Sequence, residues 1–239
     1  MVDTPSEKSR SSSFSGPLLA SRRHTVIFLA ILAAVAAWGV ASQQRFGGGA
    51  PTLSPGAKWA AYASVVALQI LLVRYVAIGI HRKGMTLRDL LGDVSTAPRR
   101  VMIDLLLAVG FLAAARVLSP LLGAALGGRE DVGRVIGPSG PAQVAAWILV
   151  SLAAGIGEEI SFRGYLQGQF ARMTSSLPAA ILLQAAAFAV PHMYQGWRAA
   201  LGTGIYGLAF GVLAAARKSL RPGILAHALV DVVGGITSG

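Results

Sequence analysis

The sequence contains no cysteine and few charged side chains. Without cysteine, the chain cannot form disulfides, thiolate zinc sites or a cysteine nucleophile. Only 13% of its residues are charged, whereas a soluble domain carries roughly a quarter. Apolar sequence is abundant instead, with 54% hydrophobic residues and a mean hydropathy of +0.61. This composition indicates a membrane protein rather than a soluble enzyme.

Apolar runs that approach or reach the length of a membrane span recur along the chain. A hydrocarbon core of roughly 30 Å needs about 20 helical residues. The runs predict about seven spans, at residues 25–41, 59–80, 101–118, 142 into the 160s, 177–190, 199–216 and 223–236. The 29 glycines suit helices that pack closely in a bilayer. We therefore predict an all-α, polytopic transmembrane helix bundle of about seven to eight helices.

The net charge of +11 comes mainly from basic residues at the edges of the apolar runs. This pattern is typical of positive-inside anchoring and disfavours a nucleic-acid partner. The most basic segments are the N-terminus, the loop 81–100 and the connection 217–221, which share one side if the spans alternate. We expect a multi-pass protein of the cell membrane with its N-terminus in the cytoplasm.

The chain divides into three parts by composition. Residues 1–24 are rich in serine and basic residues and are expected to form a disordered cytoplasmic tail. Residues 25–141 are expected to form N-terminal transmembrane helices, with a short amphipathic surface helix at 85–91. Residues 142–237 are expected to form the transmembrane core that carries the chemistry.

Several charged residues lie inside predicted spans. Arg74, Asp104 and Arg116 are near span ends, so snorkelling to the interface accounts for them without chemistry. Glu158 and Glu159 follow a long apolar stretch instead. Carboxylates inside a membrane cost roughly 2.5 kcal/mol or more each unless they are paired or hydrated, and they usually mark function. The alternative is that this pair simply ends a helix at the interface.

Helix geometry gives the two acids different roles. Glu159 and Arg163 are four residues apart, on one helix face, and can form an ion pair. Glu158 is about 100° around the helix and has no local partner. An unpaired carboxylate in an apolar setting suits a general acid or base.

Two histidines accompany these acids on apolar segments. His192 ends one apolar run, and His227 lies in the last span with Asp231 four residues later on the same face. Counted along helices from a predicted turn at 173–178, Glu158 and His192 lie at similar depths of roughly 20–25 Å. His227 fits this depth less well. Each histidine alone could be a packed core residue, but together with Glu158 they indicate a site.

Three motifs occur in order on these segments. They are Glu158-Glu159-x-x-x-Arg163, Phe188-x-x-x-His192 and His227-x-x-x-Asp231. This set resembles that of the CPBP family, which contains the CAAX prenyl endopeptidases and Abi-like proteins. The resemblance implies an intramembrane endopeptidase that hydrolyses a peptide bond of a membrane-associated protein or peptide.

The resemblance also implies a role for each matching position. Glu158 and His192 would activate the attacking water. His227 and Asp231 would face the developing oxyanion, where preorganised donors contribute most. The residues that would support these four are Glu159, Arg163 and Phe188.

One position departs from the prenyl endopeptidases, which carry Asn where this chain has Asp231. An ionised Asp cannot donate a hydrogen bond to an oxyanion. Asp231 would therefore be protonated, orient His227 or bind a metal.

Two mechanisms fit the same residues. In the first, which we favour, no cofactor is needed and Glu158 acts on a water held by His192. In the second, Glu158, His192 and His227 hold a zinc ion with a water in its open position. Two other functional classes stay open, namely a transporter that uses the Glu/His cluster as a relay and a non-catalytic membrane adaptor. The sequence shows none of the internal repeats that many transporters carry.

Overall fold

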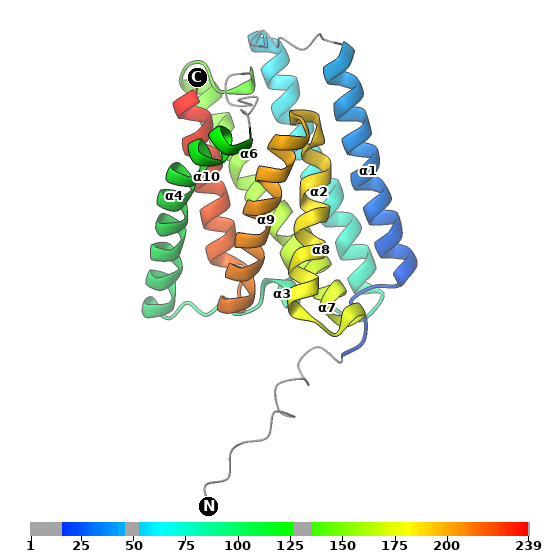
Figure 1. The fold of residues 1–239 in the computed structure, drawn as a ribbon. Coiled ribbons are helices and arrows are strands. Elements are labelled where there is room, and N and C mark those ends of the chain that lie inside the picture. Colours follow the sequence, from blue (N-terminus) through cyan, green and yellow to red (C-terminus); the bar gives the residue numbers. More distant parts are fainter. Residues whose placement is uncertain (1–15, 46–52, 127–134, 239) are drawn as a thin grey trace, which may run out of the picture.

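The computed structural model describes residues 16–45, 53–126 and 135–238. Regular structure in this part of the chain is helical, which confirms the predicted all-α bundle (Figure 1). The α-helices are α1 (Arg22–Arg45), α2 (Pro55–His81), α3 (Leu87–Leu91), α4 (Pro98–Leu126), α6 (Pro141–Glu158), α7 (Gly168–Thr174), α8 (Leu177–Ala189), α9 (Trp197–Arg217) and α10 (Arg221–Ser238). A π-helix, Glu159–Gln167, joins α6 to α7, and a 3₁₀ segment, Val190–Gln195, follows α8.

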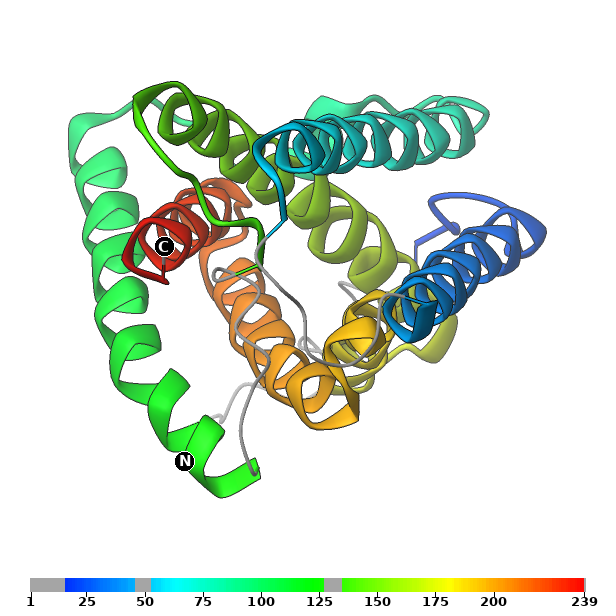
Figure 2. The ribbon, with the colours of Figure 1, turned by 90° about the horizontal axis from the view of Figure 1, so that it is seen from above.

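Each of the seven predicted spans falls on a helical stretch of the structure, and the span at 177–190 covers α8 and the first residue of the 3₁₀ segment. Six helical stretches in the described residues are long and apolar enough to cross a membrane. The seventh, α10, has 18 residues but is less apolar, because it carries Arg221, His227 and Asp231. It nevertheless runs through the bundle beside α4 and α6 (Figures 1 and 2). The helices thus alternate in direction between two ends of the molecule.

Local sequence signals explain where several helices begin and end. Ser54 and Ser176 cap α2 and α8, which have a proline at their first and second residue respectively, and each serine hydroxyl accepts a hydrogen bond from a backbone N–H of the first turn. Ser175 and Lys218 end α7 and α9 in the left-handed conformation, with φ of 53° and 51°. The polar caps therefore lie between apolar spans, where the chain reverses direction.

The longest helical stretch runs unbroken from Pro141 to Thr174. It crosses the bundle obliquely in the view from above (Figure 2). Its middle is the π-helix, and most of that segment is buried. Gly164 allows close packing there, since a Cβ on it would lie 3.1 Å from side-chain carbons of both Leu90 and Leu220. A central element of the fold is thus a tilted helix with a wide turn in its middle.

The predicted surface helix is present as α3. Thr86 donates from its backbone N and its hydroxyl to the Asp89 carboxylate, at 2.7 and 2.9 Å. These hydrogen bonds hold the pKa of Asp89 below its ordinary value. The helix does not lie free on the surface, because Leu90 is buried against the π-helix and Leu220 N donates to Leu91 O. This segment closes one end of the bundle.

Asp104 does not snorkel to an interface, contrary to expectation. Its side chain is 1% exposed, and both of its oxygens accept hydrogen bonds from arginines. Arg217 donates to Oδ1 at 2.8 Å and Arg221 to Oδ2 at 2.7 Å. Sequence separation concealed these partners, which come from α9 and α10. The cluster ties α4 to both of those helices.

Most of the predicted N-terminal tail, residues 1–15, lies outside the described part of the chain. Its last residues are packed, since α1 begins at Arg22 and both Leu19 and Ala20 are buried. The amide of Gln169 binds this segment, with Leu19 N donating to its Oε1 at 2.8 Å. His24 is buried as well, stacked on Tyr75 at 4.0 Å. The basic end of α1 is therefore anchored to α2 and α7.

Candidate active site

A fully buried ion pair forms the base of the site. Arg163 Nη1 donates to Glu159 Oε1 at 2.8 Å, and neither side chain is exposed. The pair expected from the i, i+4 spacing is thus present, although on a π-helix rather than an α-helix. The guanidinium lies 4.2 Å from the centre of the Phe188 ring and 5.0 Å from that of Phe210. This packing fixes the arginine and, through it, the carboxylate.

Glu159 connects the ion pair to His227 on α10. Its Oε1 accepts a hydrogen bond from His227 Nδ1 at 3.2 Å, because a carboxylate offers only acceptors. The first turn of α10 can approach because residue 223 is glycine, where a Cβ would lie 2.8 Å from Glu159 Oε2. The Phe210 ring stacks on the imidazole at 5.1 Å. His227 is therefore held from two sides, with its Nε2 directed away from the base.

Glu158 is held from α2. Gln69 Nε2 donates to Glu158 Oε1 at 3.0 Å, and the side chain of Gln69 is buried. Gly157 provides the room, since a Cβ there would lie 2.4 Å from Gln69 Oε1. Within the described residues, none hydrogen-bonds to the second oxygen, Glu158 Oε2. That oxygen lies 3.5 Å from His227 Nε2.

His192 lies on the 3₁₀ segment after α8 and interacts electrostatically with Glu158 and His227. Its Nδ1 lies 2.9 Å from the backbone oxygen of Phe188, and a carbonyl can only accept. The bond therefore assigns the proton to Nδ1 and leaves the Nε2 lone pair open. Phe188 also packs its ring 5.1 Å from the imidazole. The resemblance implied that Phe188 orients His192, and its backbone oxygen makes the direct contact.

Asp231 completes the cluster one turn after His227. Its Oδ2 lies 3.7 Å from His227 Nε2, beyond hydrogen-bonding distance, and its side chain is 34% exposed. The backbone oxygen of Asp231 accepts from Trp147 Nε1 at 3.0 Å, which fixes α10 against α6. Glu159, and not Asp231, makes the hydrogen bond to the His227 ring. Tyr194 interacts electrostatically with both Asp231 and Glu158.

The arrangement explains why His227 reaches the same depth as Glu158. The predicted depth of Glu158 was counted along an upright α-helix from the turn at 173–178. In the structure, the helix that carries Glu158 is tilted (Figure 2) and contains a π-helical segment. Both features reduce the vertical rise per residue. The seven predicted residues thus converge from the long tilted helix, the 3₁₀ segment with the end of α8, and α10.

Three residues that contact the site were not predicted from the sequence: Gln69, Phe210 and Tyr194. Gln69 lies in an N-terminal span, far from the motifs in sequence, and Phe210 is one apolar residue among many in its helix. Tyr194, two residues after His192, was the one that proximity to a motif could have indicated. Pairing across distant helices gave no signal in a single sequence.

Within the described residues, no group of three or more His, Cys, Asp or Glu side chains is arranged to hold a metal ion. The donor types that zinc accepts are present in Glu158, His192 and His227. Of the ring nitrogen and carboxylate atoms in these three side chains, His192 Nε2 and Glu158 Oε2 have no hydrogen bond from the described residues.

Residues 140–233 match the family model described as Type II CAAX prenyl endopeptidase Rce1-like. Over these residues the match supports the predicted resemblance to the CPBP family of CAAX-type proteases. The matched residues include all seven predicted site residues. Together with the candidate membrane spans, the match supports the general class of a membrane protease. No curated protein and no solved structure matches the chain.

Proposed function

We propose that the chain is an intramembrane endopeptidase that hydrolyses a peptide bond with a water activated by Glu158. The substrate is a membrane-associated protein or peptide, since the site lies among membrane-spanning helices. The observation that carries the proposal is that the Glu158 carboxylate combines an unpaired oxygen with 15% exposure, whereas Glu159 Oε2 also lacks a partner but its side chain is completely buried. Gln69 holds Oε1, while Oε2 has no hydrogen bond from the described residues. An oriented carboxylate with one open oxygen is suited to accept a proton from water.

His192 binds the same water in this mechanism. Its Nδ1–H donates to the backbone, so Nε2 is available as an acceptor for the second O–H of the water. The water oxygen attacks the peptide carbonyl carbon, and its proton passes to Glu158 Oε2. Collapse of the tetrahedral intermediate breaks the C–N bond, and the proton moves on to the leaving amine. Each step uses atoms that the fold leaves open.

His227 stabilises the oxyanion of that intermediate. Its Nδ1–H is committed to Glu159, and its Nε2 faces the open side of the cluster. With a proton on both ring nitrogens, His227 donates from Nε2 to the oxyanion, and the neighbouring carboxylate of Glu159 balances its charge. Asp231 donates beside it in its protonated form. Glu159 and Arg163 act as positioning residues beneath His227.

We propose that the protein lies in the cell membrane with its N-terminus in the cytoplasm. The support is the concentration of basic residues at the end of the bundle where α1 begins and where α2 and α9 end. These residues are Arg22, Arg23, Arg82, Lys83, Arg88, Arg99, Arg100, Arg172, Arg217, Lys218 and Arg221.

The test compares membranes that contain wild-type protein with membranes that contain the Glu158→Gln variant. Newly formed protein N-termini are identified by mass spectrometry in each. The proposal predicts termini that are present with wild type and absent with the variant, at equal amounts of folded protein. Identical sets of termini would remove proteolysis as the function and leave the transporter and adaptor readings.

A further inference from the structure

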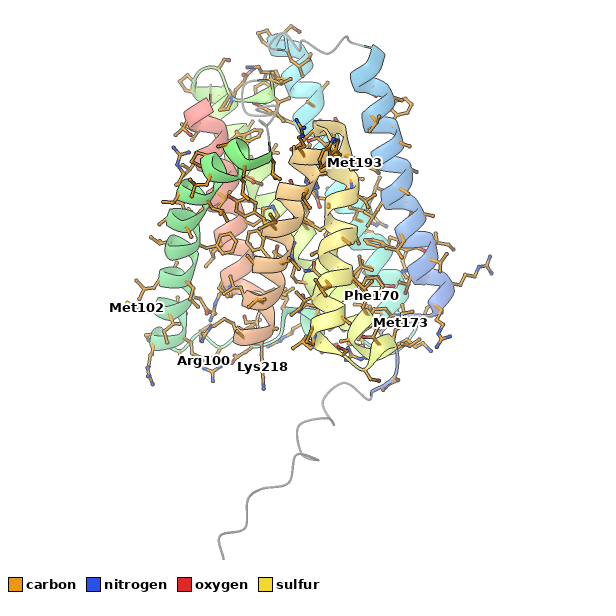
Figure 3. All side chains as sticks on the ribbon, in the orientation of Figure 1. Arg100, Met102, Phe170, Met173, Met193 and Lys218 are labelled. Atoms are coloured by element: carbon orange, nitrogen blue, oxygen red, sulfur yellow. The ribbon has the colours of Figure 1, made fainter. Side chains whose placement is uncertain are left out.

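The two ends of the bundle differ in chemistry. The basic residues named above gather at one end, where Figure 3 shows Arg100 and Lys218. The opposite end, near Met193 in Figure 3, carries tryptophans with exposed rings instead. These are Trp38, Trp59 and Trp197, which are 73%, 45% and 61% exposed. Tryptophans of this kind typically mark the boundary between a bilayer and water. We call these the basic end and the tryptophan end.

Exposure of the site increases from the basic end towards the tryptophan end. α10 begins at the basic end, where Glu159 packs against Gly223 and is completely buried. Further along α10, His227 is 9% exposed and Asp231 is 34% exposed. Glu158, at 15%, has an intermediate value. The site residues are thus more accessible to solvent on the side that faces the tryptophan end.

The elements on that side connect directly to the tryptophan end. His192 and Tyr194 are partly exposed and lie on the 3₁₀ segment that leads to Trp197. Within the described residues, the halves of α2, α4 and α9 nearer the tryptophan end each carry one basic side chain: Lys58, Arg116 and Arg198. Lys58 is buried and donates to the backbone oxygen of Gly137. This side of the site is therefore bordered by aromatic and weakly charged surface.

The route from the basic end is closed by packed side chains. Beyond the Glu159–Arg163 pair, the long tilted helix contributes Phe162, Tyr165, Leu166 and Phe170, which are at most 8% exposed. Leu90 and Leu220 pack into the same core from the basic end. A peptide could reach Glu158 from this side only by displacing that core.

We propose that substrate enters the site from the tryptophan end, so that the protein cleaves segments presented on the extracytoplasmic side of the membrane. The inference rests on the proposed protease function and on the proposed orientation with the basic end in the cytoplasm. The substrate class is then a membrane-anchored protein whose extended segment lies at the outer boundary of the bilayer. A cytoplasmic CAAX tail would approach from the opposite, closed side.

Because the chain contains no cysteine, single cysteines can report access without background. Arg198→Cys marks the tryptophan end and Lys218→Cys marks the basic end, and both positions are exposed. Asp231→Cys reports the site, and Tyr194→Cys reports the same space if the first variant does not fold. Each is treated with a membrane-impermeant maleimide in intact cells and in inverted membrane vesicles, with the wild-type protein as the blank.

The proposal predicts that the site cysteine and Arg198→Cys react at least about ten times faster in intact cells, while Lys218→Cys reacts only in inverted vesicles. A site cysteine that reacts like Lys218→Cys, or equally from both sides, would overturn it. In the comparison of N-termini, cleavage sites should lie in extracytoplasmic segments. Absence of any Glu158-dependent terminus would refute the protease function instead, while the labelling still decides the side of access.

Discussion

Two clusters of charged residues lie within the helical bundle, and they differ in how completely their atoms are paired. Both oxygens of Asp104 accept hydrogen bonds, from Arg217 and Arg221. Among the described residues, Glu158 has a hydrogen bond to one oxygen only, from Gln69. Both acids are costly in a membrane. At Asp104 the hydrogen bonds from the two arginines offset that cost, and they also join three helices. At Glu158 one carboxylate oxygen has no hydrogen bond from the described residues.

The comparison shows that charge inside a span does not by itself identify an active site. Asp104 is more deeply buried than Glu158, at 1% against 15% exposure, yet it has no open atom. Among the described residues, Glu158 Oε2 and His192 Nε2 have no hydrogen-bond partner, and the two side chains interact electrostatically. Completeness of hydrogen bonding therefore distinguishes the two clusters better than burial does.

The largest expected effect comes from removing the open acceptor. Glu158→Gln keeps the shape of the side chain and a hydrogen-bonding amide, but it cannot take a proton from water. We expect kcat for peptide cleavage to fall by about 10²–10⁴-fold, with little change in thermal stability. Cleavage rates and melting curves of the purified variant check this. Wild-type cleavage by the variant would mean that another group activates the water.

The sequence predicted the helical bundle and the residues that come together in the candidate site, but not the contacts between helices that hold them there. All seven predicted residues converge, and the two i, i+4 pairs, Glu159–Arg163 and His227–Asp231, each share one helix face as their local spacing predicts. The π-helix and the bond from Gln69 were not predicted. Both depend on contacts between helices distant in sequence, which hydropathy and spacing do not record. The roles assigned to the seven residues remain predictions.

The next largest effect is on stability. Arg163→Met leaves the carboxylate of Glu159 completely buried without its partner, which should cost about 3–5 kcal/mol of unfolding free energy. Combining it with Glu159→Gln should recover part of this loss. Unfolding in detergent micelles measures both variants. If the single and double variants lose equal stability, the charge of Glu159 is not what Arg163 compensates.

A smaller effect is expected at Gln69, which holds Glu158 without touching the substrate. Gln69→Leu removes one hydrogen bond to a charged group, worth about 1.5–3 kcal/mol, so kcat should fall by about 10–100-fold and its pH dependence should change. KM should change little. Gln143→Leu is the matched control, since Gln143 is also buried but accepts from Ser139 N. A similar change in the pH profile of both variants would contradict a positioning role for Gln69.

The smallest effect is expected at the cluster that has no open atom. Asp104→Leu leaves two arginines that are about a quarter exposed, so water can replace most of the lost interaction. We expect a loss of about 1–2 kcal/mol in stability and an unchanged kcat for the folded protein. Thermal unfolding and cleavage assays on the same preparation check both. A fall in kcat comparable to that of Glu158→Gln would erase the distinction between the clusters.

The most direct measurement of the central claim uses purified protein and a peptide that spans a Glu158-dependent cleavage site. The rate is measured after exhaustive chelation, with elemental analysis for zinc, in wild type and Glu158→Gln. We expect zinc-free wild type to cleave the peptide at its full rate and the variant not to cleave it. Loss of cleavage on chelation and its rescue by zinc would contradict the metal-free mechanism, and cleavage by the variant would contradict the role of Glu158.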